Sequence, residues 1–394
     1  MKESLVFVGA KRTPFGANGG SLKDVSPTQL GVHSAKAALA QSGVRPDQIE
    51  HLIYGNVLHS APDSIYSPRH IGLHSGVPIE VPALGLNRLC GSGFQAIVDA
   101  YQQMCAGDTE VALVGGIENM SMAPYAVRGA RWGLRMGNHE FVDTMVEALT
   151  DRYAGAPMAI TAENLAEMYK ITREDSDTFA LRSQTLTKKA IEAGAYKDEI
   201  APYAITDKKG NTVELAHDEH PRPQTTMEAL AKLKPVFKKD GIVTAGVSSG
   251  IVDGACSLVV ATEKRATAEK WKVLGRMVAY GVVGCEPKIM GIGPAGATRM
   301  ALKRAGMKLE QMDLVEVNEA FAPQTIAVER ELGINRDVLN VDGGAIAVGH
   351  PLAASGARIV THLLYALKQR GKRYGLGTAC IGGGQGIAII VEAL

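Results

Sequence analysis

Short apolar runs alternate with stretches of helical periodicity along the first 120 residues. The pattern predicts strands at 6–8, 52–57 and 110–114, and helices at about 26–41 and 93–105. Ser26 followed by Pro27 is a typical helix start, because a serine side chain caps free N–H groups and proline fits the first turn. The regular exchange of strands and helices indicates an α/β fold.

The last hundred residues repeat this alternation. The pattern predicts helices near 298–305, 324–332 and 355–369, and strands at 314–317, 375–380 and 386–391. Residues 38–50 also resemble residues 301–313, because each segment ends a helical pattern at a glycine and then turns toward the next strand. This similarity predicts that one α/β unit is duplicated within the chain.

Two reactive side chains stand at equivalent places in the proposed duplication. Cys90 precedes Ser92-Gly93 in the first half, and His350 precedes Ser355-Gly356 in the second. We therefore expect the two strand-to-helix turns to meet across a pseudo-twofold axis.

The middle of the chain has a different texture. It is rich in charge, carries helical patterns at 161–169 and 173–192, and has loops rich in proline and lysine. We interpret it as an inserted loop domain. The predicted domains are a first half of residues 1–120 with 250–270, an insertion at 121–249 that covers the site, and a second half at 271–394.

Composition excludes several classes of function. The 394 residues carry a net charge of +1 and are 46% apolar, which favours neither nucleic acid nor a membrane surface as a partner. Five cysteines without C-x-x-C pairs argue against a disulfide framework and against a structural zinc site, so no metal is expected. A reducing, cytoplasmic location follows as the expectation.

Candidate chemistry lies in segments that are far apart in the chain. Cys90 could become a thiolate nucleophile if His350 acts as its base, and the helix that follows Cys90 should lower the pKa of its thiol further. Cys380, before a run of three glycines, could give and take a second proton if its own pKa were lowered toward neutrality. Taken singly, either cysteine is more often a small buried residue.

Four motifs resemble the catalytic loops of the thiolases, in the same order along the chain. They are Cys90-Gly91-Ser92, Asn318-Glu319-Ala320-Phe321, Gly349-His350-Pro351 and Cys380-Ile381-Gly382. Similarity also covers residues 11–16 and 115–121 and extends over essentially the whole sequence. The resemblance implies the thiolase fold, in which two duplicated mixed-sheet α/β halves pack as αβαβα layers.

The resemblance also implies a mechanism. Cys90 would accept the acyl group as the nucleophile, His350 would activate it, and Cys380 would act as the acid and base in a ping-pong exchange between coenzyme A (CoA) thioesters. One oxyanion hole would use His350 and a water held by Asn318, and the other the backbone N–H groups of Cys90 and Gly382. CoA and acyl-CoA would be substrates, and no cofactor would be permanently bound.

The coenzyme is expected to lie along the inserted domain. By resemblance, the residues near it are Arg222, Ser249, Leu149, Phe237, Ala245, Met290, Phe321 and Met158. Arg222 would lie toward the nucleotide and Ser249 would bond the pantetheine, although an arginine between two prolines could equally be a solvated surface charge.

Two departures bear on the substrate. Biosynthetic acetoacetyl-CoA thiolases commonly have His-Met-Gly where this chain has Pro157-Met158-Ala159, and asparagine where it has Val247. These segments, with 218–226, look closer to degradative 3-ketoacyl-CoA thiolases of short and medium chains. An acetyl-CoA C-acetyltransferase specific for acetoacetyl-CoA is the alternative.

Two more remote alternatives belong to other classes. A β-ketoacyl synthase-like condensing enzyme would share the cysteine and the histidine but would have no need of Cys380. A non-catalytic acyl-CoA binding protein would have lost one or more reactive side chains.

The resemblance finally implies a homodimer or a homotetramer. Residues 125–137, rich in arginine and carrying Trp132, would suit a subunit contact or could form a solvent-facing loop. The cysteines and histidines without a motif are expected to be ordinary packing, loop or helix residues, among them Cys105, Cys256, Cys285 and His362.

Overall fold

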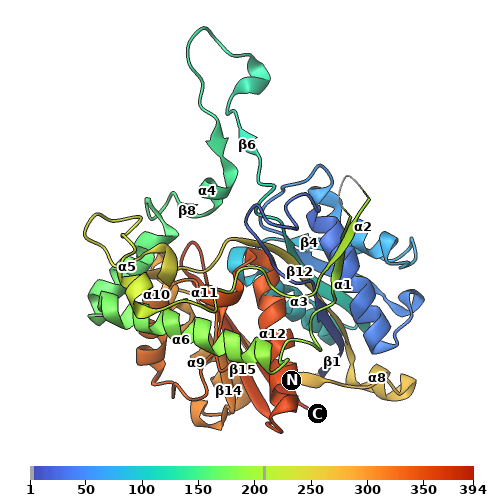
Figure 1. The fold of residues 1–394 in the computed structure, drawn as a ribbon. Helices are drawn as coiled ribbons and strands as arrows, with labels where there is room; N and C mark the ends of the chain where they lie inside the picture. Colours follow the sequence, from blue (N-terminus) through green and yellow to red (C-terminus); the bar gives the residue numbers. More distant parts are fainter. Residues whose placement is uncertain (1–3, 207–209) are drawn as a thin grey trace.

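The computed structural model describes residues 4–206 and 210–394; residues 1–3, which begin the predicted first half, lie outside this range. The main strands form one hydrogen-bonded path with two halves of like topology (Figure 1). In order, the first half contains β4 (Ala83–Leu86), β3 (His51–Gly55), β5 (Val111–Glu118), β12 (Val252–Thr262) and β1 (Leu5–Arg12). The second contains β14 (Leu314–Val317), β15 (Tyr374–Ile381), β16 (Gln385–Ala393) and β13 (Gly275–Gly284).

The predicted internal repeat is confirmed. Helix α1 (Pro27–Ser42) ends at Gly43 with φ +71°, and a short 3₁₀ turn then leads to β3. Helix α9 (Gly293–Ala305) ends in the same way at Gly306, with φ +64°, before a 3₁₀ turn and β14. Glycine adopts this left-handed conformation without steric cost, which explains why both segments stop their helix at that residue.

Two helices form the layer between the half-sheets. Helix α3 (Ser92–Ala106) packs on α12 (Leu352–Gln369), and both contribute to a core that includes strand residues of both halves. Helices α1, α2 (Ser67–His74) and α8 (Glu263–Glu269) lie on the first half, whereas α9 and α10 (Ala322–Leu332) lie on the second. The five layers follow the predicted order α, β, α, β, α.

The glycines of the two Ser-Gly pairs, Gly93 and Gly356, lie where α3 and α12 pack against each other. A methyl group added to Gly93 would stand 2.5 Å from the Ala357 nitrogen, and one added to Gly356 would stand 2.4 Å from the Phe94 nitrogen. Side chains would therefore force apart the two helices that begin beside Cys90 and His350.

Two long strands are missing from the sequence prediction. Every residue of β12 is buried, and β13 joins the halves through pairing of Val6 with Arg276 and Phe7 with Gly275. In β12 the buried Asp253, Gly254 and Ser257 interrupt the apolar residues, so the segment shows neither a clean alternation nor an unbroken apolar run.

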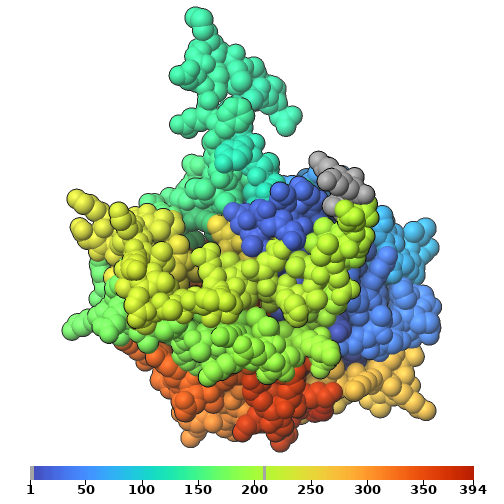
Figure 2. All heavy atoms as spheres, in the orientation of Figure 1, coloured from blue at the N-terminus to red at the C-terminus, as the bar shows by residue number. Residues whose placement is uncertain are grey.

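Within the described part of 121–249, the chain adds no strand to the large sheet. It forms the helices α4 (Thr144–Ala148), α5 (Met158–Tyr169), α6 (Arg173–Glu192) and α7 (Met227–Ala231), and the hairpin strands β6 (Tyr125–Ala126), β7 (Val142–Asp143), β8 (Thr150–Asp151), β9 (Ala156–Pro157), β10 (Tyr203–Thr206) and β11 (Thr212–Leu215). The predicted helices at 161–169 and 173–192 are α5 and α6. Between β6 and β7 an arm rises clear of the remaining surface (Figures 1 and 2).

A buried ionic cluster joins this segment to both halves. The Arg12 guanidinium donates to Glu199 at 2.7 Å and to Asp218 at 2.6 and 3.0 Å. His362 lies between Glu199 and Asp342, at 2.9 and 3.1 Å, and these carboxylates raise the pKa of its imidazole to about 10 despite its burial. The prediction that His362 is an ordinary helix residue is wrong.

Candidate active site

Cys90 lies in a 3₁₀ turn, Leu89–Gly91, directly before α3. The turn is held by side chains, because the Leu89 N–H donates to Asn87 Oδ1 at 2.9 Å and Ser92 Oγ donates to the Leu89 carbonyl at 2.7 Å. Leu89 has φ +46°, a left-handed conformation that costs a non-glycine residue about 1–2 kcal/mol. Such strain directly before a thiol is typical of functional sites.

Burial dominates the electrostatics of this thiol. It raises the pKa of Cys90 to about 11, although the Gly382 N–H bonds the sulfur and acts in the opposite direction. The sequence predicts that the start of α3 lowers this pKa. The backbone N–H groups of Gly382 and Cys90 do act in that direction, but desolvation outweighs them, so the pKa is not lowered overall.

Cys380 stands near the end of β15 and is fully buried among Met290, Ala320, Met158 and Phe321. Burial raises the pKa of its thiol well above the ordinary value, and the charge of Cys90 adds to this rise. In the free protein Cys380 therefore does not meet the condition of a thiol whose pKa is lowered toward neutrality.

The three glycines after β15 form the turn into β16. A methyl group added to Gly382 would stand 3.0 Å from Leu89 Cδ1 and 3.4 Å from Met158 Sδ. Gly383 and Gly384 have φ +80° and +83°, which glycine adopts readily. The turn therefore brings the Gly382 N–H to Cys90, close to Cys380.

His350 lies between the short helix α11 (Ala345–Val348) and α12. Its Nδ1 is 2.5 Å from Ser355 Oγ, and its Nε2 is 3.4 Å from Asn318 Nδ2, so an Nδ1–H tautomer leaves Nε2 as the basic nitrogen. Burial, followed by the charge of Arg358, lowers the pKa of this imidazole to about 3, which keeps it neutral.

Asn318 follows the last residue of β14. Its backbone N–H donates to the Thr378 carbonyl at 2.9 Å, and its buried Oδ1 has no hydrogen-bond partner among the described residues. An acceptor left free beside a basic nitrogen is suited to hold a water or a ligand group.

Glu118 has a buried carboxyl group. It lies within residues 115–121, a segment for which the sequence predicts no role. It accepts the N–H groups of Val57, Leu58 and Ala353 at 3.2, 2.9 and 3.1 Å, and burial raises the pKa of its carboxyl to about 7. It ties the end of β5 to the start of α12, behind Cys90. An acidic residue that ends an apolar strand is the signal that could have found it.

A cavity of about 420 Å³ leads to His350. Six of the eight predicted CoA-binding residues line it, namely Leu149, Arg222, Phe237, Ala245, Ser249 and Phe321. Met158 and Met290 do not line it and instead pack against Cys380 with Phe321. A second cavity of about 290 Å³ shares His220, Arg222 and Ala245 with the first, so Arg222 stands between the two.

His220 is a lining residue that sequence reasoning missed. Its Nδ1 lies 2.8 Å from the Ala347 carbonyl, which ties the segment that carries Arg222 to α11. It carries no motif of its own, and only its place beside Arg222 could have drawn attention to it.

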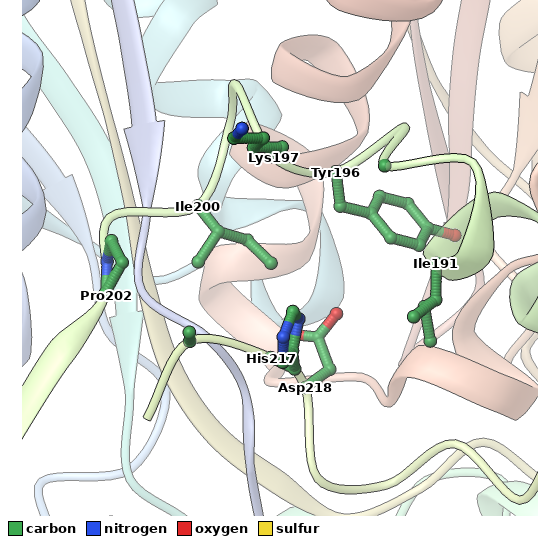
Figure 3. A pocket seen from close by; sticks show the side chains of 9 residues that line it. Ile191, Tyr196, Lys197, Ile200, Pro202, His217 and Asp218 are labelled. Carbon is green, nitrogen blue, oxygen red and sulfur yellow. The ribbon is translucent and has the colours of Figure 1, made fainter. Parts of the chain in front are cut away.

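Another cavity, of about 300 Å³, lies away from these residues (Figure 3). In this view Tyr196 and Ile191 lie on one side of it, Ile200 and Pro202 lie on the other, and His217 and Asp218 lie below. The Asp218 carboxylate is engaged by Arg12, so this cavity borders the ionic cluster that anchors the inserted segment.

Two further features are absent from residues 4–206 and 210–394. No helix there is long and apolar enough to cross a membrane. No group of three or more histidine, cysteine or acidic residues is placed to hold a metal ion in the same part of the chain.

Family models for the thiolase N-terminal domain and the thiolase C-terminal domain match residues 5–264 and 271–393. The chain belongs to the thiolase family. It is 53% identical over 387 residues to the mitochondrial 3-ketoacyl-CoA thiolases of Bos taurus and Homo sapiens, covering 98% of this chain and 97% of each relative. It is 47% identical to an acetyl-CoA acetyltransferase of Syntrophomonas wolfei, over the full length of both.

Solved thiolase structures agree with the fold. The structure of the human mitochondrial 3-ketoacyl-CoA thiolase matches with a TM-score of 0.97 at 52% identity, covering 100% of this chain and 99% of that one. The same human enzyme in complex with CoA also matches with a TM-score of 0.97. The predicted thiolase fold and acyltransferase class are confirmed.

Proposed function

We propose that this thiolase is a 3-ketoacyl-CoA thiolase that exchanges acyl groups between CoA thioesters through an acyl-Cys90 intermediate. The observation that carries the proposal is a pair of interacting thiols, Cys90 and Cys380, together with the neutral imidazole of His350, which lies 3.4 Å from the Asn318 amide and lines a cavity of about 420 Å³. A β-ketoacyl synthase-like enzyme would have no use for the second thiol, and a non-catalytic binder would have no use for either.

In thiolysis, the Cys90 sulfur attacks the 3-keto carbon of the substrate while His350 Nε2 takes its proton. The bond between C2 and C3 then breaks, and the departing carbanion takes a proton from Cys380 to leave as acetyl-CoA. The sulfur of a second CoA attacks acyl-Cys90, its thiol proton passes to Cys380, and His350 returns a proton to Cys90 as the shortened acyl-CoA leaves.

The pKa values of Cys90 and His350 explain why both side chains are uncharged in the free enzyme. With a pKa of about 11 for Cys90 and about 3 for His350, a separated thiolate and imidazolium are strongly disfavoured. Proton transfer therefore accompanies attack on a bound thioester, which also protects the thiol from side reactions in water.

Negative charge develops at two oxygens, and each has its own donors. The N–H groups of Cys90 and Gly382 would lie close to the oxygen of an acyl group on Cys90, since Gly382 already bonds the Cys90 sulfur. The second oxygen, on the acetyl-CoA carbanion, would be stabilised by His350 and by a water on the free Oδ1 of Asn318.

CoA is the proposed occupant of the two neighbouring cavities, which share His220, Arg222 and Ala245. The pantetheine would pass Ser249 and Phe237 toward His350, and Arg222 would meet the phosphates of the nucleotide. Support comes from the lining residues and from the CoA complex of a relative that is 52% identical.

The preferred acyl chain is tested by comparing kcat/KM for CoA-dependent cleavage of acetoacetyl-CoA and of a medium-chain 3-ketoacyl-CoA. Faster cleavage of the longer substrate is expected. Cleavage confined to acetoacetyl-CoA would identify an acetyl-CoA acetyltransferase, as some of the relatives are named. If neither substrate is cleaved, the proposal is refuted. A β-ketoacyl synthase-like enzyme and a non-catalytic acyl-CoA binding protein would then be the remaining candidates.

The proposed assembly is a homodimer or homotetramer. Edge strand β4 and its surroundings expose Ile65, Tyr66, Ile79 and Leu84, and the arm exposes Trp132, Leu134, Met136 and Phe141. Exposed apolar groups on an open sheet edge favour pairing with a second copy. Light scattering should give two or four chains, and removing the arm at 127–141 should lower a tetramer to a dimer.

The cytoplasmic location stays a prediction. Relatives at 53% identity are named mitochondrial, whereas those at 47% are bacterial. Fractionation of the source cells would decide it.

A further inference from the structure

The backbone around Asn318 is fixed by hydrogen bonds to the segments on both edges of β14. The Val317 N–H donates to Asn340 Oδ1 at 2.9 Å, and Asn340 Nδ2 donates to the Val317 carbonyl at 3.0 Å. The side chain of Asn340 thus bonds β14 as a neighbouring strand would, along the edge opposite β15. On the other edge, the Asn318 N–H pairs with Thr378 of β15.

Asn340 adopts an unusual backbone to do this. Its φ is +45°, one of four positive values among the described non-glycine residues, and asparagine tolerates that region better than most residues. Its N–H also donates to the Val315 carbonyl at 2.9 Å, so its backbone and its side chain both follow β14.

The carboxylate of Glu319, the residue directly after Asn318, accepts three further hydrogen bonds. It accepts Asn340 Nδ2 at 2.8 Å, Ser183 Oγ at 2.6 Å and the Ile346 N–H at 3.1 Å, and it is fully buried. A methyl group on Gly344 would stand 2.4 Å from the Glu319 carboxyl carbon, so only glycine lets the chain pass so close.

These bonds connect the two residues of one oxyanion hole. Ile346 belongs to α11, which ends two residues before His350, whereas Glu319 is adjacent to Asn318. The carboxylate therefore fixes the loop that carries the imidazole relative to the loop that carries the amide. Ser183 adds α6 of the inserted segment to the same carboxylate (Figure 1).

We propose that Ser183, Glu319 and Asn340 are positioning residues that set Asn318 against His350 and thereby stabilise the acetyl-CoA carbanion. The inference rests on the proposed function. Because the N–H groups of Cys90 and Gly382 serve the acyl group on Cys90, the three residues should affect deprotonation of acetyl-CoA far more than acyl transfer to Cys90.

The test compares two half-reactions in the full-length enzyme. One is the exchange of the α-protons of acetyl-CoA with D2O, and the other is the burst of free CoA as acetyl-CoA acylates Cys90. The variants are Ser183→Ala and Asn340→Gly, which keeps the left-handed backbone open while it removes the amide. Ser176→Ala is the matched control, since Ser176 is also a buried serine of α6 and its hydroxyl donates to the Thr172 carbonyl within the same helix region, at 3.0 Å.

The rate of α-proton exchange should fall about tenfold in Ser183→Ala and about a hundredfold in Asn340→Gly. The rate of the CoA burst should stay within about threefold of wild type in both variants. Ser176→Ala should leave both rates unchanged. Equal loss of both half-reactions, or exchange within twofold of the control in both variants, would overturn the inference and leave the proposed function intact. A wild-type enzyme without either half-reaction would instead overturn the proposed function and the inference with it.

Discussion

Gly93→Ala should disable the enzyme with only a modest loss of stability. The added methyl group would lie 2.5 Å from the Ala357 nitrogen and 2.7 Å from the Ala353 oxygen, both backbone atoms of α12. Because ordinary contact begins near 3.4 Å, α3 and α12 must separate by about 0.9 Å along the shorter line (3.4 − 2.5). These two helices begin directly after Cys90 and His350.

The expected loss of stability in Gly93→Ala is much smaller than the expected loss of activity. Overpacking of this kind costs about 1–3 kcal/mol, whereas the higher helix propensity of alanine contributes about 1 kcal/mol of stability, so the free energy of unfolding should fall by about 0–2 kcal/mol. A shift of about 1 Å in reacting groups costs about a hundredfold in rate. The loss of kcat/KM should therefore exceed what the loss of folded protein explains.

The assay pairs thermal unfolding, followed by circular dichroism, with cleavage of acetoacetyl-CoA by CoA. Gly296→Ala is the control, because it is also a helical glycine but its added methyl would meet only the side chain of Val283, at 3.1 Å. It should keep full activity. Activity of Gly93→Ala within twofold of wild type would refute the idea that this helix contact sets the geometry of the site.

Two further variants probe the ionic cluster and the CoA cavity. The pKa of His362 is raised to about 10, so the stability that it contributes is complete below the unfolded pKa near 6.5 and is lost as the pH rises through about 10. His362→Gln should thus be destabilised by about 3–5 kcal/mol at pH 7 and by much less at pH 10 in thermal unfolding, whereas a constant difference would contradict the assignment. Arg222→Ala should raise the KM for CoA about fivefold to tenfold at low salt with kcat unchanged, because it loses one exposed charge contact. The remote surface variant Arg45→Ala should not change KM, and an unaltered KM for Arg222→Ala would remove Arg222 from the CoA site.

The helices and the repeat follow from local chemistry that the sequence carries. Gly43 and Gly306 mark helix ends, and Ser26 accepts the Gln29 N–H as an N-cap should. Strand β12 escaped prediction because every one of its residues is buried, so it has no polar face. In β13 buried and half-buried residues alternate, but the half-buried positions include Val278, Tyr280 and Val282, so the sequence shows no alternation of apolar and polar residues.

The reactive side chains were predictable, but their proton affinities were not. The pKa of Cys90 depends on packing by Leu58, Met120 and Leu352, which come from three distant segments. His362 likewise owes its charge to Glu199, 163 residues away, a partner that only the folded chain brings near.

The most direct test of the two-cysteine mechanism treats Cys90→Ala and Cys380→Ala with acetyl-CoA and records the intact mass and the deuterium exchange of the α-protons. Cys90→Ala should take up no acetyl group. Cys380→Ala should gain the mass of one acetyl group and fail to exchange the α-protons. An acetylated Cys90→Ala at wild-type rate, or a Cys380→Ala that still exchanges, would contradict the account.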